Sequence, residues 1–152
     1  MPVNPELVGR EFPPTPPYLV GREKVREFAR AVFADAPQHS DPEAARALGY
    51  ADVVAPPTFA MVVQDHTLQQ LLGEPDSGIA LERTIHAEQR FRYTRPIVAG
   101  DELTAQLTVT GIRSVGSNAM ITSDAEIVDA EGRHVVTATS VLLVGGEESA
   151  DV

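Results

Sequence analysis

Four histidines offer side chains that can transfer protons near neutral pH, and they lie far apart in the sequence, at positions 39, 66, 86 and 134. Their spacing does not fit a set of metal ligands, so we expect no metal site. The chain has no cysteine, which excludes disulfides, thiolate zinc sites and a cysteine nucleophile. Neither a GxGxxG motif nor a P-loop occurs, so we expect no nucleotide cofactor.

Two histidines have an aspartate close by. Asp35 precedes His39 by four residues after a predicted helix, and His66 directly follows Asp65 on another one. Aspartate and histidine at a helix end more often cap the helix than catalyse a reaction. For His66, a hydrogen-bonded interior position or a place in a dimer interface is the commoner role. His86, which begins a strand, is expected to be structural, and His134, which follows a turn, to be exposed.

Apolar residues repeat at helical spacing in the first half of the chain. A helix is predicted from Arg22 to before Pro37, with an apolar stripe of Val25, Phe28, Ala29, Val32 and Phe33. A short helix is predicted over 41–48, with Asp41 as N-cap and Gly49 closing its end. A longer helix is predicted over 57–72. It is apolar on most sides, which indicates a buried helix.

The second half reads as β-strands. Residues 88–94 alternate, with Gln89, Phe91 and Tyr93 on one face, and strands are predicted at 103–112, 120–128 and 135–144. A short strand is expected at 18–20. Short turns between the long strands predict an antiparallel meander, and a buried helix before it predicts an α+β fold with the sheet wrapped around that helix. We expect one domain over 1–145 and a disordered acidic tail over 146–152.

The formal net charge of −10 makes nonspecific binding to nucleic acid unfavourable. No apolar run approaches the roughly 20 residues that span a bilayer, and no signal peptide is recognised. A cytoplasmic location is therefore expected. The arginines are clustered, and Arg22, Arg26 and Arg30 share one helix face. These three, or Arg90 and Arg92, are candidates to receive a negatively charged carrier, although pairing with neighbouring glutamates is at least as common a role.

Two motifs carry a family resemblance. Ala55-Pro56-Pro57-Thr58-Phe59 resembles the start of the central helix in MaoC-like dehydratases, and Phe91-x-Tyr93-x-Arg95-Pro96-Ile97-x-x-Gly100-Asp101 resembles the strand and turn that follow. Residues 22–28 and 47–50 make the chain similar to the A subunits of mycobacterial-type (3R)-hydroxyacyl-ACP dehydratases. The resemblance covers about 8–143. It implies a hot-dog fold, a dimer of such folds, and work on 3-hydroxyacyl or 2-enoyl thioesters carried by ACP or coenzyme A.

The resemblance also implies site residues. In the family, an Asp and a His within Asp-x-Asn-Pro-x-His transfer the protons, and a backbone N–H at the start of the central helix stabilises the enolate oxygen. Here Pro37-x-His39 matches, but Asp35 stands one residue too close to His39. Pro57 occupies the position of the oxyanion donor and has no N–H. Asp35 and His39 are therefore weak catalytic candidates.

Three functional hypotheses remain open. In the first, the chain is the substrate-binding subunit of a dehydratase, in a heterodimer with a catalytic MaoC-like chain, and contacts the acyl thioester through Pro57, Thr58, Phe59, Val62 and Val63. In the second, it is a homodimeric hydratase that uses Asp35 and His39. In the third, it binds acyl thioesters without catalysis. A thioesterase with a helix-borne acid beside His66 is a weaker alternative.

Overall fold

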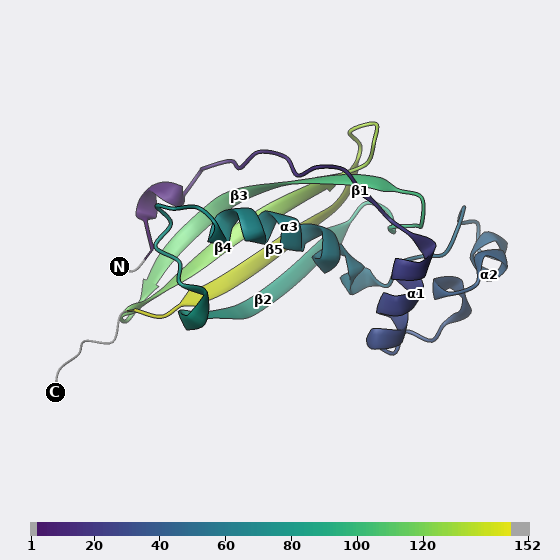
Figure 1. The fold of residues 1–152 in the computed structure, drawn as a ribbon, viewed down its shortest axis with the longest axis horizontal. Coiled ribbons are helices and arrows are strands. Elements are labelled where there is room, and N and C mark those ends of the chain that lie inside the picture. Colours follow the sequence, from purple (N-terminus) through teal and green to yellow (C-terminus); the bar gives the residue numbers. More distant parts are fainter. Residues whose placement is uncertain (1–2, 147–152) are drawn as a thin grey trace.

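An antiparallel sheet of five strands forms the centre of the molecule, in the order β1-β3-β4-β5-β2 (Figure 1). The structure is a computed structural model and describes residues 3–146. The strands are β1 (Tyr18–Leu19), β2 (Thr84–Tyr93), β3 (Glu102–Val115), β4 (Asn118–Val128) and β5 (His134–Val144). The four long strands cover the predicted strand segments, and the short strand confirms most of the prediction at 18–20.

The strand order corrects the predicted meander. Strands β3, β4 and β5 follow one another through short hairpins. Strand β2, however, pairs with β5, with Phe91 opposite Ala138. Residues 94–101 therefore cross the end of the sheet from β2 to β3. The sequence predicted β2 and β3 as neighbours because the connection between them is short. A short connection can also cross the end of a sheet when the two strands that it joins run antiparallel.

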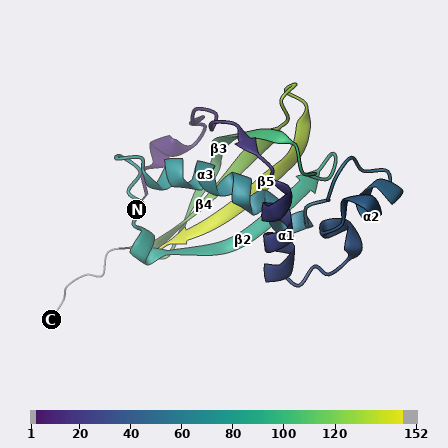
Figure 2. The same ribbon diagram turned by 45° about the vertical axis from the view of Figure 1, so that its right-hand side comes forward.

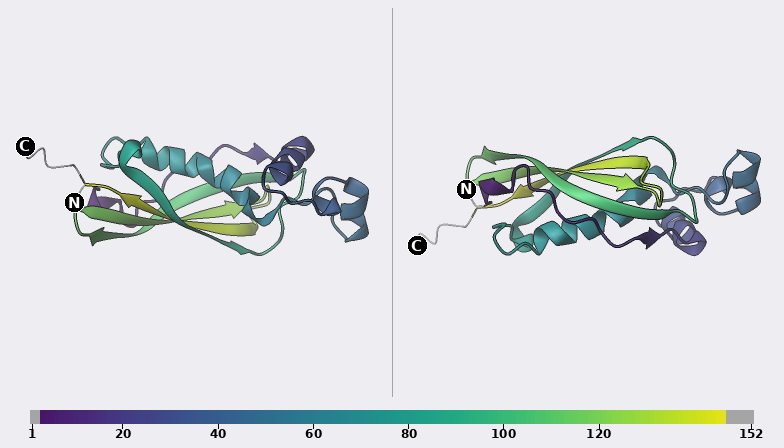
Figure 3. Two further views of the ribbon diagram at one scale, coloured as in Figure 1. Left: turned by 90° about the horizontal axis from the view of Figure 1, so that it is seen from below. Right: turned by 90° about the horizontal axis from the view of Figure 1, so that it is seen from above.

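Helix α3 (Ala60–Leu72) lies along one face of this sheet, after a 3-10 turn at Pro57–Phe59 (Figure 2). Its bounds confirm the prediction for 57–72. Val63, Gln64 and Leu68 are among the residues that it buries against the strands. Asp65 and His66 are exposed, which corrects the expectation of a helix buried on most sides. Figure 3 shows why, since α3 covers only one face of the curled sheet. This sheet around one helix is the predicted α+β hot-dog fold.

Two shorter helices project beyond one end of the sheet, α1 (Arg22–Ala31) and α2 (Pro42–Ala47) (Figure 1). The ring of Phe28 on α1 packs edge-on against Phe59, with 5.3 Å between ring centroids. Asp41 caps α2 by accepting a hydrogen bond from the backbone N–H of Glu43, as predicted. The apolar stripe of α1 was predicted one turn too long, because the helix ends at Ala31 and Phe33 is 90% exposed.

The two edges of the sheet differ. Along β3, the N-terminal segment donates from the backbone N–H of Gly9, Phe12 and Thr15 to carbonyls of Val109, Leu107 and Ala105. In the described part of the chain, nothing pairs with the outer edge of β2, which is the last strand in the sheet order. An unpaired strand edge is a template for another strand. The predicted tail lies outside the described residues except for Gly146.

Candidate functional site

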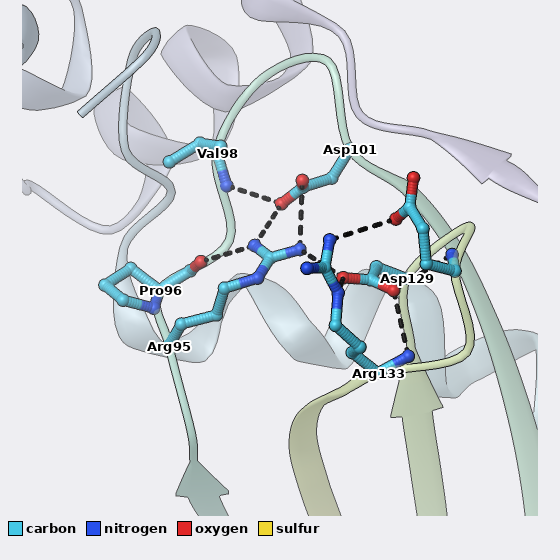
Figure 4. A network of polar contacts seen from close by, with 7 residues as sticks. Arg95, Pro96, Val98, Asp101, Asp129 and Arg133 are labelled. Carbon is cyan, nitrogen blue, oxygen red and sulfur yellow. Dashed lines mark hydrogen bonds and ion pairs between the residues drawn. The ribbon is translucent and has the colours of Figure 1, made fainter.

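A network of charged side chains fixes the crossover between β2 and β3 (Figure 4). The Arg95 guanidinium donates to both carboxylate oxygens of Asp101, at 2.9 and 3.2 Å, and to Asp129 at 3.4 Å. Asp129 also accepts hydrogen bonds from the backbone N–H groups of Arg133 and Glu131, and these lower its pKa. The network ties the crossover to the β4–β5 hairpin, which explains the Arg95-to-Asp101 spacing in the sequence.

The crossover in turn holds the strand-like segment before α3. The backbone N–H of Ala55 donates to the Ile97 carbonyl at 2.8 Å, and that of Ala99 donates to Val53 at 3.0 Å. The same segment holds His39, since Nδ1 of its ring lies 2.6 Å from the Val54 carbonyl oxygen. The His39 ring is therefore fixed on the backbone, with Nδ1 engaged.

The start of α3 is held from the opposite side by β2. The Tyr93 hydroxyl donates a hydrogen bond to the Pro57 carbonyl. Burial raises the pKa of Tyr93 to about 12, so the hydroxyl stays neutral and donates throughout the physiological range. Pro57 and Thr58 are exposed, whereas Phe59 is completely buried. Pro57 and Thr58 thus remain available to a ligand, while Phe59 belongs to the core.

A groove of about 450 Å³ follows from this point along the seam between α3 and β2. Thr58 and Met61 line it from the helix side, and the remaining lining residues come from β2: His86, Ala87, Glu88, Gln89 and Phe91. Its floor is polar. Nε2 of Gln89 donates to the Gln64 carboxamide oxygen at 2.7 Å, and Oε1 of Gln89 lies 3.0 Å from Nε2 of His86. Most of the groove's lining residues therefore belong to β2, the strand with the unpaired edge.

A second hollow of about 450 Å³ lies at the end of α1. Its lining includes Arg30, Phe33, Asp35 and Ser40, together with Arg26, Ala29 and Ala34. Asp35 therefore points into a hollow of which His39 is not a lining residue. Among the described residues, no hydrogen bond or ion pair joins Asp35 to His39.

Val62 and Val63 lie on α3 but line neither of these hollows. Val63 is 1% exposed within the core, and the partly buried Val62 packs against the same cluster. Their assignment to an acyl channel stays a prediction. His66 is exposed with its ring tilted against Tyr18, 5.8 Å between centroids. Within residues 3–146, no hydrogen bond joins the side chains of Asp65 and His66, and neither residue lines the groove or the hollow described above.

The arginine candidates separate into paired and unpaired groups. Arg22 makes two bonds to Asp52, at 2.7 and 3.0 Å, and lowers the Asp52 pKa to about 2. Arg26 pairs with Glu23 and donates to the Ser40 carbonyl. Within residues 3–146, the side chains of Arg30, Arg90 and Arg92 make no hydrogen bond or ion pair. Arg90 and Arg92 face a threonine-lined hollow on the sheet face opposite α3, with Asp124 beside them.

Comparison with known proteins identifies the family. The family described as FAS1-like, dehydratase domain region, matches residues 6–138. The chain belongs to this family. It is 61% identical over 148 residues to a UPF0336 protein of Leifsonia xyli subsp. xyli, covering 97% of this chain and 99% of the relative.

Two solved structures place the fold among dehydratases. A C-terminally truncated HadBC (3R-hydroxyacyl-ACP dehydratase) complex from Mycobacterium tuberculosis is similar with a TM-score of 0.82 and 30% identity, over 90% of this chain and 96% of the other. A MaoC-like dehydratase has a TM-score of 0.77 and 38% identity, over 91% of this chain and 42% of that one. The MaoC-like resemblance is confirmed for the family, while the resemblance to A subunits stays a prediction.

In the part of the chain that the structure describes, no three His, Asp or Glu side chains lie together as a set of metal ligands. No helix within residues 3–146 has the length and apolar character to span a bilayer.

Sequence reasoning missed two features of the site. The Gln64–Gln89 pair was not singled out, although a glutamine inside an apolar helix is itself a signal of a buried hydrogen bond. The position of Phe33 was assigned to the helix stripe, because aromatic spacing does not reveal where a helix stops.

Proposed function

We propose that this chain is the substrate-binding subunit of a (3R)-hydroxyacyl-thioester dehydratase or enoyl hydratase, and that a partner hot-dog chain supplies the catalytic Asp and His. The observation that carries the proposal is the separation of the local pair. His39 is held on the Val54 carbonyl at 2.6 Å, and Asp35 lines a different hollow. A base and an acid that eliminate water must both reach one substrate.

The start of α3 supports the same proposal. Elimination develops negative charge on the thioester oxygen, which needs a backbone donor at hydrogen-bond distance. Pro57 stands at this turn and has no N–H, and its carbonyl is engaged by Tyr93. The turn can still contact a bound thioester through the exposed Thr58. It is thus better suited to holding a substrate than to activating it.

The acyl thioester is proposed to lie in the seam between α3 and β2. Thr58 belongs to the predicted substrate contacts and also lines this groove, which Met61 and Phe91 flank with apolar surface. A pocket with apolar walls and a few polar groups is the usual form of a small-molecule site. The acyl carrier can be ACP or coenzyme A.

The partner is proposed to dock on the open edge of β2. This edge is unpaired, and two large apolar side chains beside it are exposed, Leu81 at 67% and Ile85 at 63%. Backbone hydrogen bonds along the edge and burial of these side chains both favour a second strand. A partner there would also close the open side of the groove, so that residues of both chains would face one substrate.

The test is co-expression with a MaoC-like chain that carries an intact Asp-x-Asn-Pro-x-His motif. Hydration of crotonyl-CoA and of a longer 2-enoyl-CoA is followed by the loss of enoyl absorbance. We expect no turnover by this chain alone, turnover by the complex, and loss of that turnover when the partner's motif histidine is replaced by alanine. His39→Ala in this chain should leave the activity of the complex within about twofold, because His39 has no acid or base partner here and Asp35 lines a different hollow.

Other outcomes identify the other hypotheses. Turnover by the pure chain that disappears in His39→Ala would establish the homodimeric hydratase and overturn the proposal. Stabilisation by acyl-CoA without turnover, with no complex formed although both chains fold, would favour the non-catalytic binding protein. Ile85→Glu should reduce complex formation. The matched control is Leu48→Glu, because Leu48 is also an exposed apolar residue, at 61%, but lies at the end of α2, away from β2.

A further inference from the structure

Phe33 occupies a backbone conformation that its side chain makes costly. Its φ is +59°, and it is the only non-glycine residue with positive φ among residues 3–146. A bulky residue in this region is strained, and such strain gathers at ligand sites. The ring is 90% exposed, so packing within the chain does not compensate for it. Phe33 lines the hollow at the end of α1 with this exposed ring.

Arg30 lines the same hollow with an unpaired guanidinium. The other arginines of α1 are engaged, Arg22 with Asp52 and Arg26 with Glu23 and the Ser40 carbonyl. The Arg30 side chain is exposed and makes no hydrogen bond or ion pair with any described residue. On a chain with a net charge of −10, this unpaired cation shares its hollow with a single acidic side chain, Asp35. It favours an anionic ligand at this point.

We propose that this hollow binds the 3′-phosphorylated adenosine diphosphate portion of coenzyme A, with the adenine stacked on Phe33 and a phosphate on Arg30. The inference rests on the proposed function, because it names the carrier of the acyl group. A planar base stacks on an aromatic ring, and guanidinium groups bind phosphate through paired hydrogen bonds. Helix α1, whose last residues line this hollow, lies at the end of the molecule where α3 also begins (Figure 2).

The other polar groups of the hollow limit the orientation of the ligand. Asp35 is a carboxylate and repels phosphate, so it faces the base or ribose, whose amino and hydroxyl groups can donate to it. Ser40 can donate or accept through its hydroxyl. Arg26 adds positive charge, although its guanidinium is already shared with Glu23 and the Ser40 carbonyl. Arg30 therefore supplies the main phosphate contact, while Asp35 disfavours phosphate beside its own carboxylate.

The experiment measures binding of adenosine 3′,5′-bisphosphate and of coenzyme A to the pure full-length chain by calorimetry. We expect both to bind, and Arg30→Ala to weaken each roughly tenfold or more, the size expected for a charge-assisted hydrogen bond. Phe33→Gly should weaken both by a similar factor through loss of stacking. Arg46→Ala is the matched control, since Arg46 is exposed on neighbouring α2, pairs with Glu43 and lies outside the hollow.

Each alternative result would overturn a defined part of the proposed coenzyme A site. No binding of the bisphosphate by the native chain would overturn the inference, as would equal losses in Arg30→Ala and Arg46→Ala, which indicate only general charge attraction. Binding that Phe33→Gly leaves unchanged would overturn the stacking. The bisphosphate carries neither thioester nor acyl group. An acyl N-acetylcysteamine thioester that binds while the bisphosphate does not would therefore sink this inference and leave the proposed function standing, with ACP as the carrier.

Discussion

The end of α1 allows one stability prediction to be worked out in detail. The backbone N–H of Ala34 donates to Ala29 at 2.8 Å and that of Phe33 donates to Arg30 at 3.3 Å. This pair of bonds is a Schellman motif, which requires a left-handed residue at the position of Phe33. Helix α2 ends in the same way, with glycine in that position, since Gly49 has φ +92°. The two helix ends differ mainly in the residue at the left-handed position.

We expect Phe33→Gly to stabilise the protein. The left-handed conformation costs a non-glycine residue about 1–2 kcal/mol, and glycine returns about 0.4–1 kcal/mol of this by gaining freedom in the unfolded chain. The ring is 90% exposed, so its removal loses little burial. The net gain is about 0.5–1 kcal/mol, or roughly 1–4 °C in Tm for a chain of this size. Urea denaturation followed by circular dichroism and calorimetry would both measure it.

Two variants test the reasoning. Phe33→Ala keeps the Cβ that causes the strain and should gain little. Gly49→Ala introduces the same strain where an added Cβ meets nothing within 4 Å, and should lower the free energy of unfolding by about 0.5–1 kcal/mol after the same unfolded-chain term is subtracted. If Phe33→Gly is neutral or destabilising, or if Phe33→Ala stabilises it equally, backbone strain is not the cause. Gain of stability together with loss of nucleotide binding would show that the ring is retained for a ligand.

Two further predictions concern the ionic contacts. Arg95→Ala should lower the free energy of unfolding by about 1–2 kcal/mol, because it leaves Asp101 and the little-exposed Asp129 without their shared partner. The control is Arg133→Ala, which should lower it by less than about 0.5 kcal/mol, because 75% of the Arg133 side chain is exposed. Equal losses in the two variants would contradict the role given to Arg95. Asp52 has a folded-state pKa of about 2, below its unfolded value of 3.8, so its pairing stabilises the fold above about pH 4 and is lost as pH falls through 2. Asp52→Asn should therefore lower stability at pH 7 by roughly 1 kcal/mol after solvent screening and have a much smaller effect near pH 2; an equal effect at both values would exclude the ionic explanation.

The sequence predicted the elements better than their arrangement. Periodicity identified α3 and all four long strands, because burial on one face leaves a repeating apolar pattern. It could not place β2 beside β5, since the alternation of Gln89, Phe91 and Tyr93 fits either neighbour. The Arg95–Asp129 contact, which joins residues 34 positions apart, depends on that arrangement and was equally inaccessible.

In the candidate site too, the local features could be predicted from the sequence and the long-range contacts could not. The shift of Asp35 relative to His39 and the proline at position 57 can be read from local spacing, and both already argue against independent catalysis. What spacing cannot show is that His39 is held on the Val54 carbonyl, or that Asp35 enters a hollow with Phe33 and Arg30. These contacts change how the one-residue shift of Asp35 relative to His39 is interpreted. A displaced catalytic pair could be restored by a small movement, whereas Asp35 lines a hollow to which His39 does not contribute. The substrate-binding role is favoured for that reason, and the activity of the His39→Ala complex is the measurement that decides it.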